Sequence, residues 1–272
     1  MVRTGREMRK TKQGGWAVGG LAIALAGVLS APAGPASARA GGGASARATL
    51  EIQKEKNKKT VQTGVLLEDR GTLQILVDGQ PAGSEEFEIR ESGGEWTARG
   101  TAEVPGEKGG TAKVTGKLTL SPDGAPLRYE WSATAPRKAS AVIDFQGTLA
   151  KMELKLEGAA PYMQDFQFNA PPVVILDNNM YHQYAILSRL YDWEHRETKT
   201  YAVLIPQDLT PGTVTAEYGG QQVVDGQKLD MLRVRTTDLE IDVFCDPGQQ
   251  ERLVRLEVPS AKAVIVRQTG KK

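Results

Sequence analysis

PPVVILDNNMYHQYAILSRLYDWEH, residues 171 to 195, reads as an aromatic and helical stretch in a chain whose other segments alternate like β-strands. It has neither glycine nor proline from Met180 to Trp193, and Asp177, Asn178 and Asn179 before it are suitable N-cap residues. With about 100° between successive residues, one stripe holds Met180, Tyr184, Leu187 and Tyr191, flanked by Ile186, Leu190 and Trp193. The pattern predicts an amphipathic helix over about residues 178 to 193, with an apolar face too wide for exposure to solvent.

From residue 71 onward, apolar and polar residues alternate with a period of two. In KMELKLE, residues 151 to 157, Met152, Leu154 and Leu156 oppose the charged residues. Turn dipeptides divide the runs, among them Asp78-Gly79 and Asp225-Gly226, and Asp-Gly supplies the positive φ angles of a tight hairpin turn. We count about twelve to fourteen strands on these signals.

So many strands exceed what a flat open sheet normally carries. They fit either a two-sheet β-sandwich or one curved sheet wrapped into a half-open barrel. A sandwich fills its core from its own two sheets, whereas a curved sheet has a concave apolar face that a helix can fill. We therefore predict a mainly β domain over residues 61–268, a strongly curved antiparallel sheet enclosing the helix, with the sandwich as the alternative.

The first sixty residues have a different composition. Residues 1–38 read as a removed secretory signal, with a basic start, an apolar run from Trp16 to Leu29 and the small-x-small site Ala36-Ser37-Ala38. An uncleaved anchor is the alternative, but the run is short for a span of about 20 apolar residues. Residues 39–60 form a flexible Gly/Ala-rich and charged lead-in. We expect a periplasmic or secreted protein without a transmembrane segment once the signal is removed.

Charge and cysteine content exclude some classes. The chain has 34 Lys+Arg and 33 Asp+Glu, a net charge of +1, which gives no electrostatic footprint for nucleic acid. A single cysteine, Cys245, rules out an internal disulfide. In LEIDVFC its side chain shares a strand face with Leu239, Ile241 and Val243, so we expect a buried thiol that packs as a small hydrophobe.

The closing strands, DLEIDVFCDPGQQERLVRLEVP at residues 238 to 259, complete a recognisable pattern. An exported chain with a long antiparallel meander, a helix and strands of this form resembles the half-open β-barrels of periplasmic lipoprotein carriers. It is also similar to exported bacterial proteins of unknown function thought to share that fold. The resemblance covers roughly residues 71 to 267, without a specific motif, and it implies a cavity for acyl chains between sheet and helix. The carriers have several helices where this chain has one.

No strong catalytic motif is present: there is no G-x-S-x-G, H-E-x-x-H or C-x-x-C, and no Gly-rich phosphate loop before a helix. The candidate metal ligands are Asp177, His182, Asp192, Glu194 and His195. The two histidines would lie about 20 Å apart along a continuous helix. We therefore expect no metal, no cofactor and no catalytic residue, with His182 on the polar face of the helix and His195 in solvent.

These patterns favour a non-enzymatic binding module that holds a lipid-like or other hydrophobic small molecule in the groove between sheet and helix. Aromatic side chains suit the mouth of such a pocket. The predicted lining is Trp131, Tyr184, Leu187, Tyr191 and Trp193. Two alternatives stay open. One is a structural or interaction module of the cell envelope, with a packed interior and protein partners at its sheet edges. The other is an envelope hydrolase with His182 as its base.

Overall fold

The computed structural model describes residues 65–105, 111–135, 137–169, 172–207, 209–236 and 239–269. The expected signal and lead-in lie outside the described residues. The described residues contain fifteen strands, all in one sheet. They are β1 (Asp69–Val77), β2 (Gln80–Ser92), β3 (Glu95–Pro105), β4 (Thr111–Leu120), β5 (Pro126–Ala133), β6 (Ala139–Gln146), β7 (Leu149–Leu156), β8 (Tyr162–Gln167), β9 (Val173–Ile175), β10 (Lys199–Ile205), β11 (Thr210–Val224), β12 (Gln227–Arg235), β13 (Glu240–Asp246), β14 (Arg252–Val258) and β15 (Ala263–Arg267).

Strand β1 lies at the centre of the sheet, and the strands on each side of it are arranged in chain order, forward on one side and backward on the other. Starting at β1, the strands run outward in sequence to β8 at one edge, and β15 pairs with the other side of β1. From β15 the order runs backward along the chain to β9 at the second edge. Neighbours are antiparallel except β9 and β10, which are parallel. The described strands therefore form a single sheet, and the alternative of a two-sheet sandwich is not found among them.

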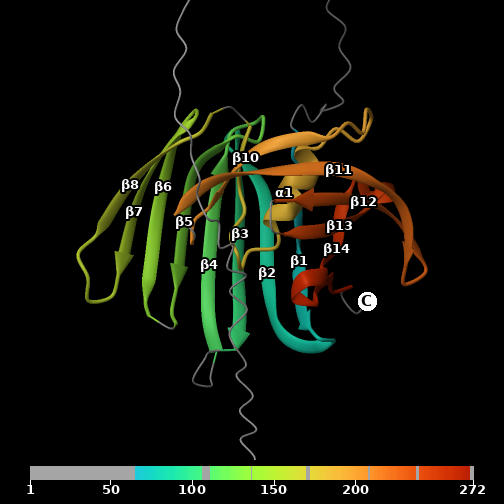
Figure 1. Ribbon diagram of the computed structural model, residues 1–272, viewed down its shortest axis with the longest axis horizontal. Coiled ribbons are helices and arrows are strands. Elements are labelled where there is room, and N and C mark those ends of the chain that lie inside the picture. The colour runs from blue at the N-terminus through green and yellow to red at the C-terminus, as the bar shows by residue number, and fades with distance from the viewer. Residues whose placement is uncertain are drawn as a thin grey trace, which may run out of the picture.

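The chain itself shows that this sheet curls. The strands β8 and β9 form its two edges, yet five residues, 168 to 172, separate them in the sequence. Since an extended chain spans about 3.3–3.6 Å per residue, the end of β8 and the start of β9 lie within roughly 20 Å of each other. At the β8 edge, Gln164 Nε2 donates a hydrogen bond to the carbonyl oxygen of Leu209, which lies 3.1 Å away and just before β11 in the chain. In Figure 1, β10 and β11 run across the upright strands β3 to β5.

Hairpin turns appear where the Asp-Gly pairs predict them. Asp78 and Gly79 have φ angles of 49° and 75° between β1 and β2. Asp225 and Gly226 have nearly the same values, 50° and 78°, between β11 and β12. Both positions occupy the left-handed region that such turns require.

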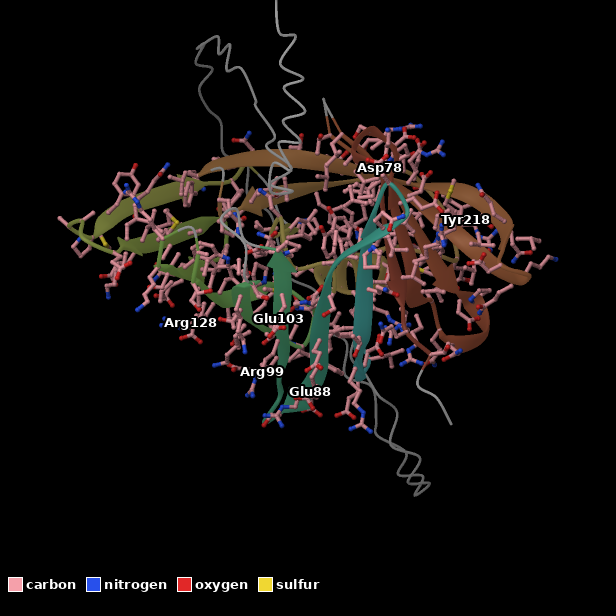
Figure 2. The ribbon with its side chains drawn as sticks, turned by 90° about the horizontal axis from the view of Figure 1, so that it is seen from below. Asp78, Glu88, Arg99, Glu103, Arg128 and Tyr218 are labelled. Atoms are coloured by element: carbon pink, nitrogen blue, oxygen red, sulfur yellow. The ribbon has the colours of Figure 1, made fainter. Side chains whose placement is uncertain are left out.

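Because apolar and polar residues alternate along the strands, one face of the sheet is buried and the other is exposed to solvent. The apolar core draws side chains from strands far apart in the sequence, and Ile75, Leu118, Ile143 and Ile265 are each exposed by 2% or less. Charged residues occupy the other face, where the ammonium of Lys117 lies 3.2 Å from the carboxylate of Glu130. Figure 2 shows Glu88, Arg99 and Arg128 along one outer side of the sheet.

The helix α1 (Gln183–Leu190) is shorter than the predicted span of about 178 to 193. Before it, the carboxylate of Asp177 accepts a hydrogen bond from Asn179 N at 2.9 Å, which favours a turn over a helix. After it, Tyr191 is extended, with φ −80° and ψ 140°. Its residues Gln183 to Ser188 are all buried. No helix in the described ranges has both the length and the apolar character needed to cross a bilayer.

Two short 3-10 helices complete the described elements, η1 (Pro247–Gln249) after β13 and η2 (Pro259–Ala261) after β14. The loop that contains η1 has two residues with positive φ, Gln250 at 53° and Glu251 at 58°. This loop lies near the last turn of α1, because Gln249 and Gln250 line the same hollow as Arg189.

Candidate functional site

A narrow groove lies between the segment that leads into α1 and the strands of the C-terminal half of the sheet. One wall contains Asn178, Tyr181 and Tyr184, and the other contains apolar side chains such as Val234 and Leu256. The cavity volume is about 30 Å³. This space holds about two water molecules, whereas pockets for small molecules measure roughly 300–1,000 Å³.

Of the five predicted lining residues, Tyr184 lies in this groove and is 9% exposed. Burial raises the pKa of its hydroxyl well above the ordinary value. Leu187 is 1% exposed and borders a separate cavity of about 10 Å³ beside Leu118. Trp131 is half-buried and packs against the cluster of Ala102, Val114 and Met180, and its indole Nε1 is buried without a hydrogen-bond partner in the described part of the chain. The two residues therefore lie apart from the groove.

Tyr191 and Trp193 belong to a third location. The ring of Trp193 meets Tyr191 edge-on with centroids 5.1 Å apart, and it meets Tyr218 of β11 in the same way at 6.3 Å. Trp193 Nε1 donates a hydrogen bond to Ser188 O at 2.7 Å. The common stripe predicted for Tyr184, Leu187 and Tyr191 does not form, because the helix ends at Leu190 and the chain turns away.

A buried carboxylate links the sheet to the start of the helix. The side chain of Glu85 on β2 is fully buried, and its Oε2 accepts hydrogen bonds from Tyr181 N at 2.8 Å and His182 N at 3.2 Å. Its Oε1 pairs with His182 Nδ1. No side chain from the helix's own sequence caps its N-terminus. Glu85 therefore satisfies backbone donors at the entry to α1 that would otherwise have no acceptor.

Two glycines opposite each other in the sheet make room for these polar groups. Gly100 of β3 pairs with Gly116 of β4. A Cβ atom on Gly100 would lie 2.6 Å from Glu85 Oε1 and 2.6 Å from His182 Cε1. A Cβ atom on Gly116 would lie 2.7 Å from the hydroxyl of Tyr129. The missing side chains form a recess that Glu85, His182 and Tyr129 occupy.

A second buried carboxylate, Asp177, extends the polar network. It accepts hydrogen bonds from the Tyr129 hydroxyl at 2.8 Å and from Gln207 Nε2 at 2.7 Å. Its backbone N–H donates to Gln183 Oε1 at 2.6 Å. Burial raises the pKa of the Asp177 carboxyl. Burial, and then the nearby charge of Asp177, raise the pKa of the Tyr129 hydroxyl.

The network fixes the helix in place and offers little for catalysis. His182 is 1% exposed, which corrects its predicted position on a solvated polar face. Its ring stacks on Phe87 with centroids 5.7 Å apart, and its Nε2 is buried with no hydrogen-bond partner among the described residues. A general base needs to reach the proton that it removes. In this position His182 is part of the network that holds the start of α1 against the sheet.

The other predicted metal candidates do not join His182. His195 is exposed and pairs with Asp192, with 2.7 Å between Nδ1 and Oδ2. Across the described ranges, no three His, Cys, Asp or Glu side chains come together in a way that could hold a metal ion. The thiol of Cys245 is buried, as predicted, and burial raises its pKa to about 12.

One member of this network, Glu85, stands out in the sequence, although its partner does not. In the strand segment around Glu85, alternation places this carboxylate on the same face as Phe87 and Ile89, which are buried. A charged residue on an apolar strand face indicates a buried partner. Its partner, His182, lies 97 residues away in the chain, so spacing could not identify it.

No protein-family model matches this chain, and no curated protein matches it. Among solved structures, the chain is similar to the crystal structure of a beta-barrel-like protein of the domain of unknown function DUF1849 from Brucella abortus. The two chains share 11% sequence identity, and the TM-score is 0.46. The match covers 75% of this chain and 95% of that one.

Proposed function

We propose that this chain is an exported, non-enzymatic module of the cell envelope that acts through its surface, as a structural or protein-interaction module. In this proposal the sheet forms a half-open barrel, and α1 fills its concave side. The observation that carries the proposal is the filled interior: the groove beside Tyr184 has a volume of about 30 Å³. Export rests on the sequence pattern of residues 1–38.

The buried position of His182 supports a non-enzymatic role. A hydrolase would need the free nitrogen of this ring to reach a water molecule or a nucleophile. His182 Nε2 is instead closed from solvent by the core. Removing the ring would therefore disturb the fold rather than a reaction.

The edge strand β8 is the surface that we assign to a protein partner. Among the strands that the structure describes, β8 pairs with β7 alone, so the backbone groups on its other side lie outside the ladder. Tyr162 and Met163 at its start are 48% and 66% exposed. An edge strand with exposed apolar side chains can take up an extended segment of another protein by strand addition.

Site-specific cross-linking in the envelope of the native host tests this proposal. A photoreactive phenylalanine analogue in place of Met163 should give one discrete adduct, identified by mass spectrometry. The same analogue in place of Val223, which is 70% exposed on β11 near the β11–β12 turn, is the matched control. Equal adduct patterns at both positions, or no adduct at Met163, would contradict a partner at β8.

A second function, binding of a lipid-like ligand, is favoured by the apolar groove itself. Tyr184, one of the five predicted lining residues, borders it together with the apolar side chains of Val234 and Leu256. Mass spectrometry of an organic extract of the purified protein distinguishes the two functions. An apolar ligand that is extracted from the wild type but not from Val234→Trp supports ligand binding. An extract of the wild type without any ligand rejects it.

A further inference from the structure

A polar hollow lies at the end of the helix, away from the groove beside Tyr184. Its walls come from the start of β1, the later part of β2, the last turn of α1 and the loop around η1. The cavity volume is about 780 Å³, within the range of roughly 300–1,000 Å³ typical of small-molecule sites. A second hollow of about 1,150 Å³ shares Arg70, Glu88 and Arg252 with it.

Arg189 in the last turn of α1 lines this hollow and has no counter-ion among the described residues. The residue is half-buried, and it makes neither a hydrogen bond nor an ion pair with any residue in the described ranges. Burial lowers the pKa of its guanidinium, because the charged form loses part of its hydration. A partly desolvated charge without a partner is unfavourable, and a bound anion would compensate it.

The other charges of the hollow are largely paired. Arg252 Nε lies 3.1 Å from Asp69 Oδ1, and Arg267 Nη2 lies 2.6 Å from Asp69 Oδ2, so one carboxylate serves two guanidinium groups. Glu88 lies 3.8 Å from Arg90. Overall the lining has four arginines and three carboxylates, which leaves one positive charge in excess.

Two carboxylates attract Arg189: first Asp69, which is already paired with Arg252 and Arg267, and then Glu251. Glu251 is a weak partner for this guanidinium. It attracts Arg189 without forming an ion pair with it. Its Oε2 is buried and has no hydrogen-bond partner in the described part of the chain. Burial raises the pKa of Glu251 to about 7, so this carboxyl is charged for only part of the time at neutral pH. Arg189 therefore keeps its capacity to bind an external anion.

We propose that this hollow binds a small ligand through an oxyanion group, a carboxylate or a phosphate, with Arg189 as the anchoring side chain. A planar guanidinium matches two oxygens of such a group with two parallel hydrogen bonds. Arg70, which also lines the hollow and has an exposed side chain, is placed to add a second positive charge at its mouth. This site is separate from β8 and from the apolar groove.

Titration calorimetry at constant ionic strength, with inorganic phosphate and with acetate as probes and chloride as the balancing anion, tests the proposal. We expect Arg189→Gln to weaken binding of the preferred probe about 10- to 100-fold, the cost of losing a charged hydrogen-bond pair. Arg189→Lys keeps the charge without the paired geometry and should give an intermediate loss. Arg99→Gln, an exposed arginine of β3, is the matched control and should bind like the wild type.

Co-sedimentation with vesicles of phosphatidylglycerol and phosphatidylcholine in equal parts distinguishes a lipid headgroup from a free anion. Binding to vesicles alone, lost in Arg189→Gln, assigns the oxyanion to a lipid. Binding to phosphate or acetate, lost in the same variant, assigns it to a soluble ligand. If no probe binds, or if Arg99→Gln and Arg189→Gln reduce binding equally, the site is rejected. Circular dichroism and thermal unfolding of each variant confirm that it is folded.

Discussion

Glu85 on β2 accepts a hydrogen bond from the backbone N–H of Tyr181 at 2.8 Å, although 96 residues separate the two in the chain. The same carboxylate accepts a second backbone N–H, that of His182, at the start of the helix. One buried side chain of the sheet thus fixes where α1 begins. The helix is positioned by the sheet, because its own sequence supplies no side-chain cap.

We predict that Glu85→Ala lowers the free energy of unfolding by about 3–5 kcal/mol, because it removes one partner of a buried pair and leaves backbone donors unsatisfied. Equilibrium denaturation in urea measures this loss. Glu88→Ala, on the outer face of the same strand, should change stability by less than about 1 kcal/mol because its ion pair is exposed. Equal losses in the two variants would show that Glu85 does not anchor the helix.

Gly100→Ala should destabilise the protein by about 1–3 kcal/mol, because the added methyl group would overlap Glu85 Oε1 and His182 Cε1. The control is Gly212→Ala on β11, where a Cβ atom would meet Val203 Cγ1 at an ordinary 3.4 Å. Thermal unfolding of both variants tests the difference. A Gly100→Ala protein as stable as Gly212→Ala would mean that the recess is wider than the structure shows.

The raised pKa of Glu251 predicts a dependence of stability on pH. In the folded protein the carboxyl holds its proton up to a pH of about 7, against about 4.5 for its ordinary value. Between these values the folded state binds more protons than the unfolded state, so the free energy of unfolding falls as pH rises.

Replacing Glu251 with Gln should remove this fall and raise the free energy of unfolding at a pH of about 8. The gain should be about 1–2 kcal/mol once solvent screening of a half-buried group is allowed for. Urea denaturation across this pH range measures it. Glu103→Gln, an exposed carboxyl of β3, controls for the change in net charge. Parallel pH profiles for Glu251→Gln and the wild type would refute the assignment.

Cys245 should resist thiol reagents in the folded protein. Its side chain is fully buried, and burial raises the pKa of the thiol to about 12, so both access and thiolate are lacking. We expect reaction with a disulfide reagent to be at least about 100-fold slower in buffer than in denaturant. The chain has one cysteine, so the absorbance change that accompanies reaction with the reagent reports this site alone. Rapid labelling of the native protein would show that β13 opens locally.

Local sequence signals predicted much of the sheet. Alternation in KMELKLE and the turns at Asp78-Gly79 and Asp225-Gly226 depend on neighbouring residues, and the strands and hairpins are found where they indicate. The strands β8 and β9 carried no such signal, because short edge strands have few alternating positions. The exact ends of α1 also escaped prediction, since a turn at Asp177 and the extended Tyr191 replace helical turns that the stripe implied.

The candidate sites are formed by residues that are distant in the sequence. The sequence could therefore suggest individual residues but could not show which of them lie together. Tyr184 lines the groove, whereas Leu187, Tyr191, Trp193 and Trp131 lie outside it. Arg189 appeared in the sequence as one polar residue of a helix. Its unpaired position in a hollow became visible once β1, β2 and the loop around η1 were assembled around it.

The sequence alone determined a mainly β chain with one helix, because strand alternation, turn chemistry and helical periodicity are properties of short segments. The tertiary structure alone decided how far the sheet curls, how much of its interior is filled and which charges are buried together. These features result from contacts between residues that lie up to about a hundred positions apart, such as Glu85 with His182. Within PPVVILDNNMYHQYAILSRLYDWEH, the periodicity predicted a helix, and the carboxylate of Glu85 on a distant strand binds the backbone where that helix begins.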